Sequence, residues 1–220
     1  MIAIHSVPTI ASQLHLDILH AWLDNWQIKI NQAKSSNVTF TTTRTTCPQV
    51  TMNNTTIPMR PTVKYIGLYL DQRLTWSTHI KTKRLHLNLK LRSMNLLLGR
   101  TSQLSFANKL VLYKCVLKPI WTYGVQLWGY ANPSHTQIIQ RLQSRILRSI
   151  TGGPWYVSNL TLHQDLHIPY VVTEIRQLFR LYDRRLANHH NPHVTGLAVL
   201  PPIARRLKRQ LPTDLLNDPQ

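Results

Sequence analysis

The chain has 220 residues, of which 43% are hydrophobic, enough to bury the core of one large domain or of two small ones. Its 26 lysines and arginines against 8 acidic residues give a net charge of +18, so nucleic acid is the expected partner and an anionic membrane surface the alternative. Two cysteines exclude a disulfide framework or a zinc ribbon and indicate a reducing, intracellular setting, the nucleus or the cytoplasm.

Mixed helix and strand patterns occupy residues 1–74. Apolar residues recur at helical spacing over residues 8–26 and predict an amphipathic helix. The β-branched residues 37–43 predict a short strand, and residues 49–58 predict a small hairpin that turns at Asn53-Asn54. Residues 62–70 predict one further strand, in which Gly67 marks a bulge or a close backbone approach.

Helical patterns begin near residue 75. The predicted helices span residues 76–98, 105–128, 133–150, 160–166 and 169–189. The second is expected to kink or break at Pro119, and the third to end at Gly152. No stretch is apolar for long enough to cross a membrane. The fold class is therefore α+β and mostly α: a small antiparallel β piece in residues 1–74, helices in residues 75–200, and a basic, Pro-rich tail in residues 201–220.

The acidic residues are scattered along the chain. Two-metal phosphoryl transfer needs carboxylates gathered around ions that lie a few Å apart, and no close pair stands on a strand or turn suited to this. The sequence therefore argues against polymerase or nuclease activity by this chain alone, and whether it is an enzyme stays open. His163 and His167 have a spacing that zinc sites use, but Gln164 stands where zinc metalloproteases carry glutamate, so no metal site is predicted.

Two of the predicted helices carry a stripe of basic residues at helical spacing. The stripes consist of Lys81, Arg84 and Arg92 in the first, and of Arg141, Arg145 and Arg148 in the third. Compensating glutamates are missing beside the first stripe, so i,i+4 ion pairs cannot neutralise it. We expect these stripes to contact the backbone of an RNA–DNA or DNA duplex; a merely solvated basic face is the alternative.

Four runs of sequence stand out in chain order. They are I-N-Q-A-K-S-S-N-V-T-F, V-K-Y-I-G-L-Y-L-D followed by L-T-W-S-T-H-I, Y-G-V-Q-L-W-G-Y, and R-L-Q-S-R-I-L-R-S-I-T-G-G-P-W-Y-V. Together they resemble a non-LTR retrotransposon reverse transcriptase of the jockey-like kind, from the end of its palm through its thumb and the helical region that follows. The resemblance covers the chain from about residue 8 to about residue 200.

The resemblance implies specific roles. Lys34 would protonate or neutralise the leaving pyrophosphate, although a solvated loop lysine is the alternative. Lys64, Tyr65 and Gly67 would belong to a primer grip that holds the terminal phosphates of the primer; Tyr65 and Ile66 are also expected to pack partly into the core.

For the intact protein the resemblance implies RNA-directed DNA polymerisation with Mg²⁺ held by an aspartate pair. In that family the pair lies just upstream of the first helix, and it is missing from this chain, which is therefore expected to hold no cofactor and to be inactive alone. Trp76 and His79 are expected to anchor a thumb helix rather than to do chemistry. A non-catalytic basic module that binds nucleic acid is the alternative function.

Overall fold

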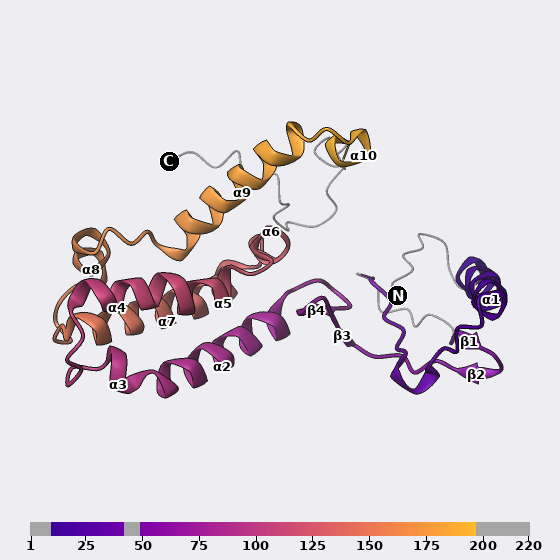
Figure 1. The fold of residues 1–220 in the computed structure, drawn as a ribbon, viewed down its shortest axis with the longest axis horizontal. Helices are drawn as coiled ribbons and strands as arrows, with labels where there is room; N and C mark the ends of the chain where they lie inside the picture. Colours follow the sequence, from indigo (N-terminus) through magenta and orange to yellow (C-terminus); the bar gives the residue numbers. More distant parts are fainter. Residues whose placement is uncertain (1–9, 42–48, 197–220) are drawn as a thin grey trace. The chain divides into compact units, whose positions relative to one another are not determined.

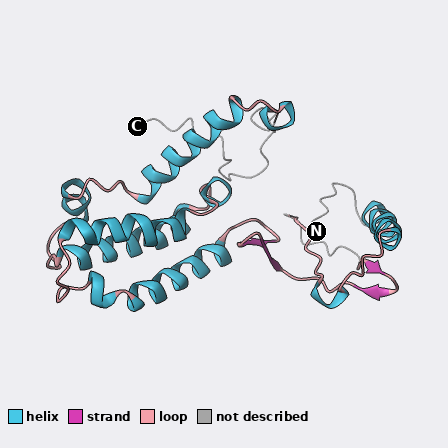
Figure 2. Cartoon of the chain, in the orientation of Figure 1, coloured by secondary structure: helices cyan, strands magenta, loops and turns pink. Residues whose placement is uncertain are grey.

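The computed structural model describes residues 10–41 and 49–196 of the chain. These residues form two compact units, an N-terminal unit that ends at Thr78 and a helical unit that begins at His79. Among the described residues, strands occur in the N-terminal unit alone, as the magenta arrows in Figure 2 show. The predicted fold class, mostly helical with small antiparallel β pieces, is confirmed.

One long helix and two small hairpins make up the described part of the N-terminal unit. Its elements are α1 (Ile10–Asn25), the 3₁₀ turn η1 (Gln32–Lys34), β1 (Thr51–Met52), β2 (Thr55–Thr56), β3 (Thr62–Tyr65) and β4 (Leu68–Asp71). β1 pairs antiparallel with β2, and β3 pairs antiparallel with β4. The side chain of Gln13 joins α1 to β1, because its Nε2 donates to the Thr51 carbonyl at 2.9 Å and its Oε1 accepts from the Thr51 amide at 3.0 Å.

The first hairpin has the predicted turn, since Asn53 and Asn54 both adopt left-handed backbone angles (φ 50° and 56°). The single strand predicted over residues 62–70 is wrong. Ile66 and Gly67 are left-handed as well (φ 45° and 74°) and reverse the chain in a two-residue turn. Gly67 therefore lies in a turn and not in a bulge.

The strand predicted over residues 37–43 is wrong for residues 37–41, and residues 42–43 lie outside the described residues. Asn37 makes one isolated bridge to Met59, and the Thr41 amide donates to the Gln72 carbonyl at 3.0 Å. β-branched residues favour an extended backbone, but a strand also needs a continuous partner along its edge. This segment has only single contacts and no ladder.

Helices and helical turns of very different lengths make up the described part of the helical unit (Figure 1). They are α2 (Ser77–Ser93, which begins in the N-terminal unit), α3 (Asn95–Leu98), α4 (Phe106–Leu112), the π-helical turn η2 (Tyr113–Leu117), α5 (Lys118–Thr122), α6 (Val125–Trp128), α7 (Pro133–Thr151), α8 (Asn159–Asp165), α9 (Val171–Ala187) and α10 (Pro192–Thr195). The central helix is α7, which packs against α4, α8 and α9. The core includes the fully buried side chains of Tyr113, Trp121, Trp128 and Leu147.

Of the kink or break predicted at Pro119, the break does not occur. Pro119 lies in the first turn of α5, directly after the π-helical turn, where its missing N–H leaves no regular helical bond unmade. The chain instead breaks at Gly124, whose left-handed backbone (φ 68°) starts α6. The helix predicted over residues 76–98 is also interrupted, at Met94 between α2 and α3.

The other helices follow the predictions closely. α7 ends at Gly152, which has a left-handed backbone (φ 64°), and α8 and α9 occupy the predicted segments to within about two residues. After α9, Pro192–Thr195 form one further helical turn, capped by the Asn191 side chain. The start of the first predicted helix and the tail at residues 201–220 lie outside the described residues.

Two glutamines of α7 connect the helices of this unit. Gln143 is buried and its Nε2 donates to the Tyr113 hydroxyl at 2.9 Å and to the Pro169 carbonyl at 3.1 Å. Burial is the main cause that raises the pKa of Tyr113 to about 12, so this hydroxyl stays protonated and can accept the bond at physiological pH. Gln140 accepts from the Val171 amide at 2.7 Å and so holds the start of α9.

Candidate nucleic-acid interface

The helix α2 presents a cationic face. Lys81, Arg84 and Arg92 are exposed and recur at i, i+3 and i+11, which places them on one side of the helix. The 17 residues of α2 include no Asp or Glu, so no acid of this helix neutralises the face. The structure thus brings together the three residues of the first predicted stripe.

The opposite side of α2 is anchored in the core of the helical unit. His79 and Ile80 are fully buried, and the His79 ring lies 6.2 Å from the ring of Trp128. Burial, with the nearby charge of Lys83 as a smaller cause, lowers the pKa of His79 to about 4, so this side chain is neutral at physiological pH. Trp76 is also buried. Both residues are therefore packed, as expected for anchors of this helix.

Lys83 is set apart from the exposed face although it lies on the same helix. It is partly buried, and its Nζ lies 4.9 Å from the centre of the Tyr123 ring. Burial lowers the pKa of Lys83 from its ordinary value. This lysine therefore takes part in packing, and the face that polyanions can reach consists of its exposed neighbours.

The second predicted stripe, on α7, is divided in the structure. Arg141 and Arg145 are exposed, whereas Arg148 is partly buried and fastens the loop after α7. Its Nη1 donates to the Pro154 carbonyl at 2.6 Å, and its Nη2 donates to the Val157 carbonyl and to Asn159 Oδ1, both at 2.9 Å. These three charge-assisted hydrogen bonds stabilise the loop after α7, whether or not Arg148 also contacts a ligand.

We expect Arg148→Met to destabilise the helical unit by about 2–3 kcal/mol, because it removes bonds from a charged donor and leaves two carbonyls of the loop without that partner. Arg145→Met is the matched control, since Arg145 is exposed on the same helix, and about 0.5 kcal/mol or less is expected. Urea denaturation followed by circular dichroism compares the two. Equal stabilities would contradict the role of Arg148 in holding the loop.

The hairpin β3–β4 brings Lys64, Tyr65 and Gly67 together at its turn. Lys64 stands opposite Tyr69, and its Nζ lies 5.8 Å from the centre of that ring. Tyr65 is 43% exposed and Ile66 is 66% exposed, so the expectation that both pack partly into the core is wrong for Ile66, which lies in the turn. Buried Leu68 anchors the hairpin from its other strand. The turn therefore offers a cation, a flat ring and accessible backbone.

Lys34 lies at the end of the short turn η1. Its amide donates to the carbonyl and to the side-chain oxygen of Asn31, both at 3.2 Å, which holds the turn closed. The side chain of Lys34 is exposed. The ammonium of Lys34 is therefore accessible, and the segment at residues 37–41, which forms no strand, follows it in the chain.

The described residues form no cluster of metal-binding side chains. Within residues 10–41 and 49–196, no three His, Cys, Asp or Glu side chains gather in a way that could hold an ion. Asp71 instead accepts from the amides of Thr75 and Trp76 at 2.9 and 3.0 Å and so shapes the turn before α2. These residues do not fit the two-carboxylate site that nucleotidyl transfer uses.

Membrane-spanning helices are also absent from residues 10–41 and 49–196, where every helix is too short or too polar to cross a bilayer.

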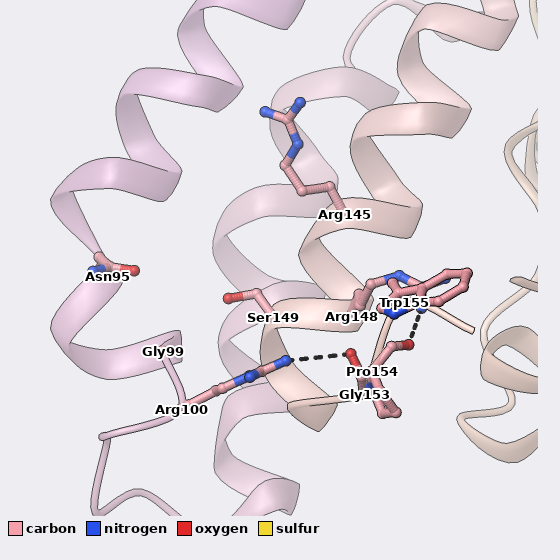
Figure 3. Close-up of a pocket in the computed structure, with 9 residues that line it drawn as sticks. All are labelled: Asn95, Gly99, Arg100, Arg145, Arg148, Ser149, Gly153, Pro154 and Trp155. Carbon is pink, nitrogen blue, oxygen red and sulfur yellow. Dashed lines mark hydrogen bonds between the residues drawn. The ribbon is translucent and has the colours of Figure 1, made fainter. Parts of the chain in front are cut away.

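A hollow of about 630 Å³ lies between α3 and the end of α7 (Figure 3). Two of its lining residues, Arg100 and Trp155, were not predicted as site residues, although Trp155 lies in the last of the four runs of sequence quoted above. Arg100 follows the end of a helix and Trp155 follows Gly-Gly-Pro, positions that are typical of loops in general. Only the tertiary structure brings these two residues, which follow α3 and α7, to the same hollow.

Comparison with known proteins gives relatives of one kind. The chain is 42% identical over 196 residues to a probable RNA-directed DNA polymerase from the transposon X-element of Drosophila melanogaster, covering 89% of this chain and 22% of the relative. It is 36% identical over 217 residues to the RNA-directed DNA polymerase from the mobile element jockey of Drosophila funebris, covering 95% and 24%. A probable RNA-directed DNA polymerase from the transposon BS of Drosophila melanogaster is 34% identical over 200 residues, covering 90% and 22%.

The chain spans less than a quarter of the length of these relatives. No protein-family model matches it. No solved structure matches it either.

Proposed function

We propose that this chain, which is homologous to a segment of the non-LTR retrotransposon reverse transcriptases of the jockey, X-element and BS elements, acts as the part of such a polymerase that grips nucleic acid. The observation that carries the proposal is the exposed face of Lys81, Arg84 and Arg92 on a helix that has no acidic residue. Such a face attracts phosphates along a duplex and reads no sequence.

The helical unit would then act as a thumb with the helical region that follows it. The N-terminal unit would act as the end of a palm, and the chain would be the C-terminal part of its polymerase. A thumb must hold a rigid cationic surface against the duplex. Fully buried His79 and Ile80 supply that rigidity, because they fix the inner side of α2 while its outer side stays exposed. The contacts would follow the backbone of an RNA–DNA or DNA duplex, in the nucleus or the cytoplasm.

The β3–β4 turn would act as the primer grip. Lys64 would neutralise a terminal phosphate of the primer, Tyr65 would offer its exposed ring, and Gly67 would let the backbone approach closely because it has no side chain. Lys34 would protonate or neutralise the leaving pyrophosphate, and Mg²⁺ held by other residues of the polymerase would supply the metal chemistry. Within residues 10–41 and 49–196 no three His, Cys, Asp or Glu side chains gather to hold that ion, so the carboxylates would come from elsewhere in the polymerase and this chain alone is expected not to polymerise.

The experiment that tests the proposal compares three nucleic acids with the purified chain across a series of salt concentrations. They are an RNA–DNA primer–template with a recessed end, a blunt duplex of the same length and a single strand. We expect the recessed end to compete best, because the primer-grip turn adds contacts at a 3′ terminus to those that α2 makes along the duplex. A labelled primer–template with the other two as competitors measures the preference directly.

A second candidate function is supported by the net charge of +18, which by itself would make the chain a general nucleic-acid-binding module. That module would bind all three nucleic acids with equal affinity and the same steep dependence on salt. Equal binding would therefore overturn the primer-grip assignment and favour the second candidate. Absence of binding to all three would overturn both.

A further inference from the structure

The hollow between α3 and the end of α7 is basic. Its lining includes Arg100, Arg145 and Arg148, together with Ser149 and Trp155, and no carboxylate. Figure 3 shows the side chains of Asn95 and Ser149 pointing toward each other from its two sides. A concave surface with several cations and no anion favours an anionic ligand.

Arg100 is oriented toward this hollow by the glycines that end α7. Its side chain passes over Gly152, where an added Cβ would lie 3.6 Å from Cγ of Arg100, and its Nη2 donates to the Gly153 carbonyl at 3.5 Å. That long bond uses one of the five N–H groups of the guanidinium, so the others remain available for a phosphate. Arg145 is exposed on the same side, and no other described residue pairs with its guanidinium.

Trp155 projects from the loop that Arg148 fastens. Its side chain is 87% exposed, and its only described ring neighbour is Tyr156, in an edge-to-face arrangement with the centroids 6.0 Å apart. The bond from Arg148 to the Pro154 carbonyl holds the residue directly before it. An exposed indole beside arginines is a combination with which proteins bind unpaired bases, because every base has a face that can stack.

We propose that this hollow binds single-stranded nucleic acid, with backbone phosphate on Arg100 and Arg145 and one unpaired base stacked on Trp155. The inference deepens the proposed function and rests on it. A duplex would use only the two arginines, since its bases are already stacked on one another and cannot reach the indole. The ligand is therefore a single strand, such as the part of a template that extends beyond the primer.

The test measures the affinity of the whole chain for a single-stranded dT12 oligonucleotide and for a blunt 12-base-pair duplex. Trp155→Ala is expected to weaken binding of the single strand by about 5- to 150-fold and binding of the duplex by less than twofold. Trp155→Phe retains a ring and should restore most of the loss. Trp26→Ala, at another exposed tryptophan outside the helical unit, is the matched control and should change neither affinity.

Arg100→Gln with Arg145→Gln is expected to lower the slope of log K against log salt for the single strand by about 1.4. Arg184→Gln with Arg185→Gln removes the same charge from exposed positions at the end of α9 and should lower it by less. If Trp155→Ala weakens single strand and duplex equally, or neither, the inference is overturned while the proposed function stands. If the unmodified chain binds neither nucleic acid, the proposed function fails first. Circular dichroism checks that each variant folds.

Discussion

The triple charge reversal K81E/R84E/R92E is expected to weaken binding of a nucleic-acid duplex by roughly two to three orders of magnitude at 0.1 M salt. Each phosphate contact contributes about 0.9 to the slope of log K against log salt. Three contacts therefore strengthen binding by about 2.7 units of log K when the salt concentration falls tenfold, from 1 M to 0.1 M. The three side chains are exposed on one side of α2, and their removal leaves the buried side of the helix unchanged. The salt slope should accordingly fall by about 2.7.

The matched control is K114E/R184E/R185E, which changes the net charge by the same amount at exposed positions of the helical unit. Fluorescence anisotropy with a labelled duplex, repeated at five salt concentrations, gives both affinity and slope. If the two triple variants lose the same affinity, net charge alone governs binding and the α2 face has no special role. Unchanged binding by K81E/R84E/R92E would remove the thumb assignment of this face altogether.

Replacing Lys118 by methionine is expected to destabilise the helical unit by about 3–5 kcal/mol, because it leaves the Glu174 carboxylate buried without its charged partner. The Lys118 Nζ lies 2.7 Å from Glu174 Oε1, and the Glu174 side chain is only 8% exposed. The pair joins α5 to α9, segments more than fifty residues apart in the chain. Urea denaturation followed by circular dichroism measures the change.

Two further variants separate loss of the pair from loss of the lysine itself. Lys114→Met, at an exposed lysine of the π-helical turn, should change the free energy of unfolding by about 0.5 kcal/mol or less. The double variant K118M/E174M should recover much of the stability that K118M loses, because two apolar side chains can replace a buried ion pair. A double variant that is less stable than K118M would show that Glu174 contributes through contacts other than this pair.

Homology to reverse transcriptases of mobile elements was visible in ordered runs of the sequence, and the comparisons confirm it. The same sequence patterns also predicted most of the long helices. Apolar residues at helical spacing placed α7 and α9, and Gly152 marked the end of α7. The roles of Lys34, Lys64, Tyr65 and Gly67 stay predictions, because the structure shows where they lie and not what they bind.

Sequence patterns gave the wrong secondary structure at two places, the turn at Ile66 and the helix around Pro119. Ile66 adopts a left-handed backbone that β-branched residues seldom take, so residues 62–70 were predicted as one strand although residues 62–71 form a hairpin. Pro119 looked like a helix break, but the π-helical turn before it places it in the first turn of α5. In both cases the local backbone conformation, which the residue type did not reveal, decided the secondary structure.

By itself the sequence determined the positive charge, the long helices and the family resemblance, since each depends on composition or on residues close together in the chain. Tertiary structure decided which cations are available. Arg84 and Arg145 remain exposed, whereas Lys83 packs on Tyr123, Lys118 pairs with Glu174, and Arg148 holds three groups of the following loop. The physical reason is that a cation's availability depends on the desolvation and the partners that packing supplies, and most of these partners come from other helices or loops.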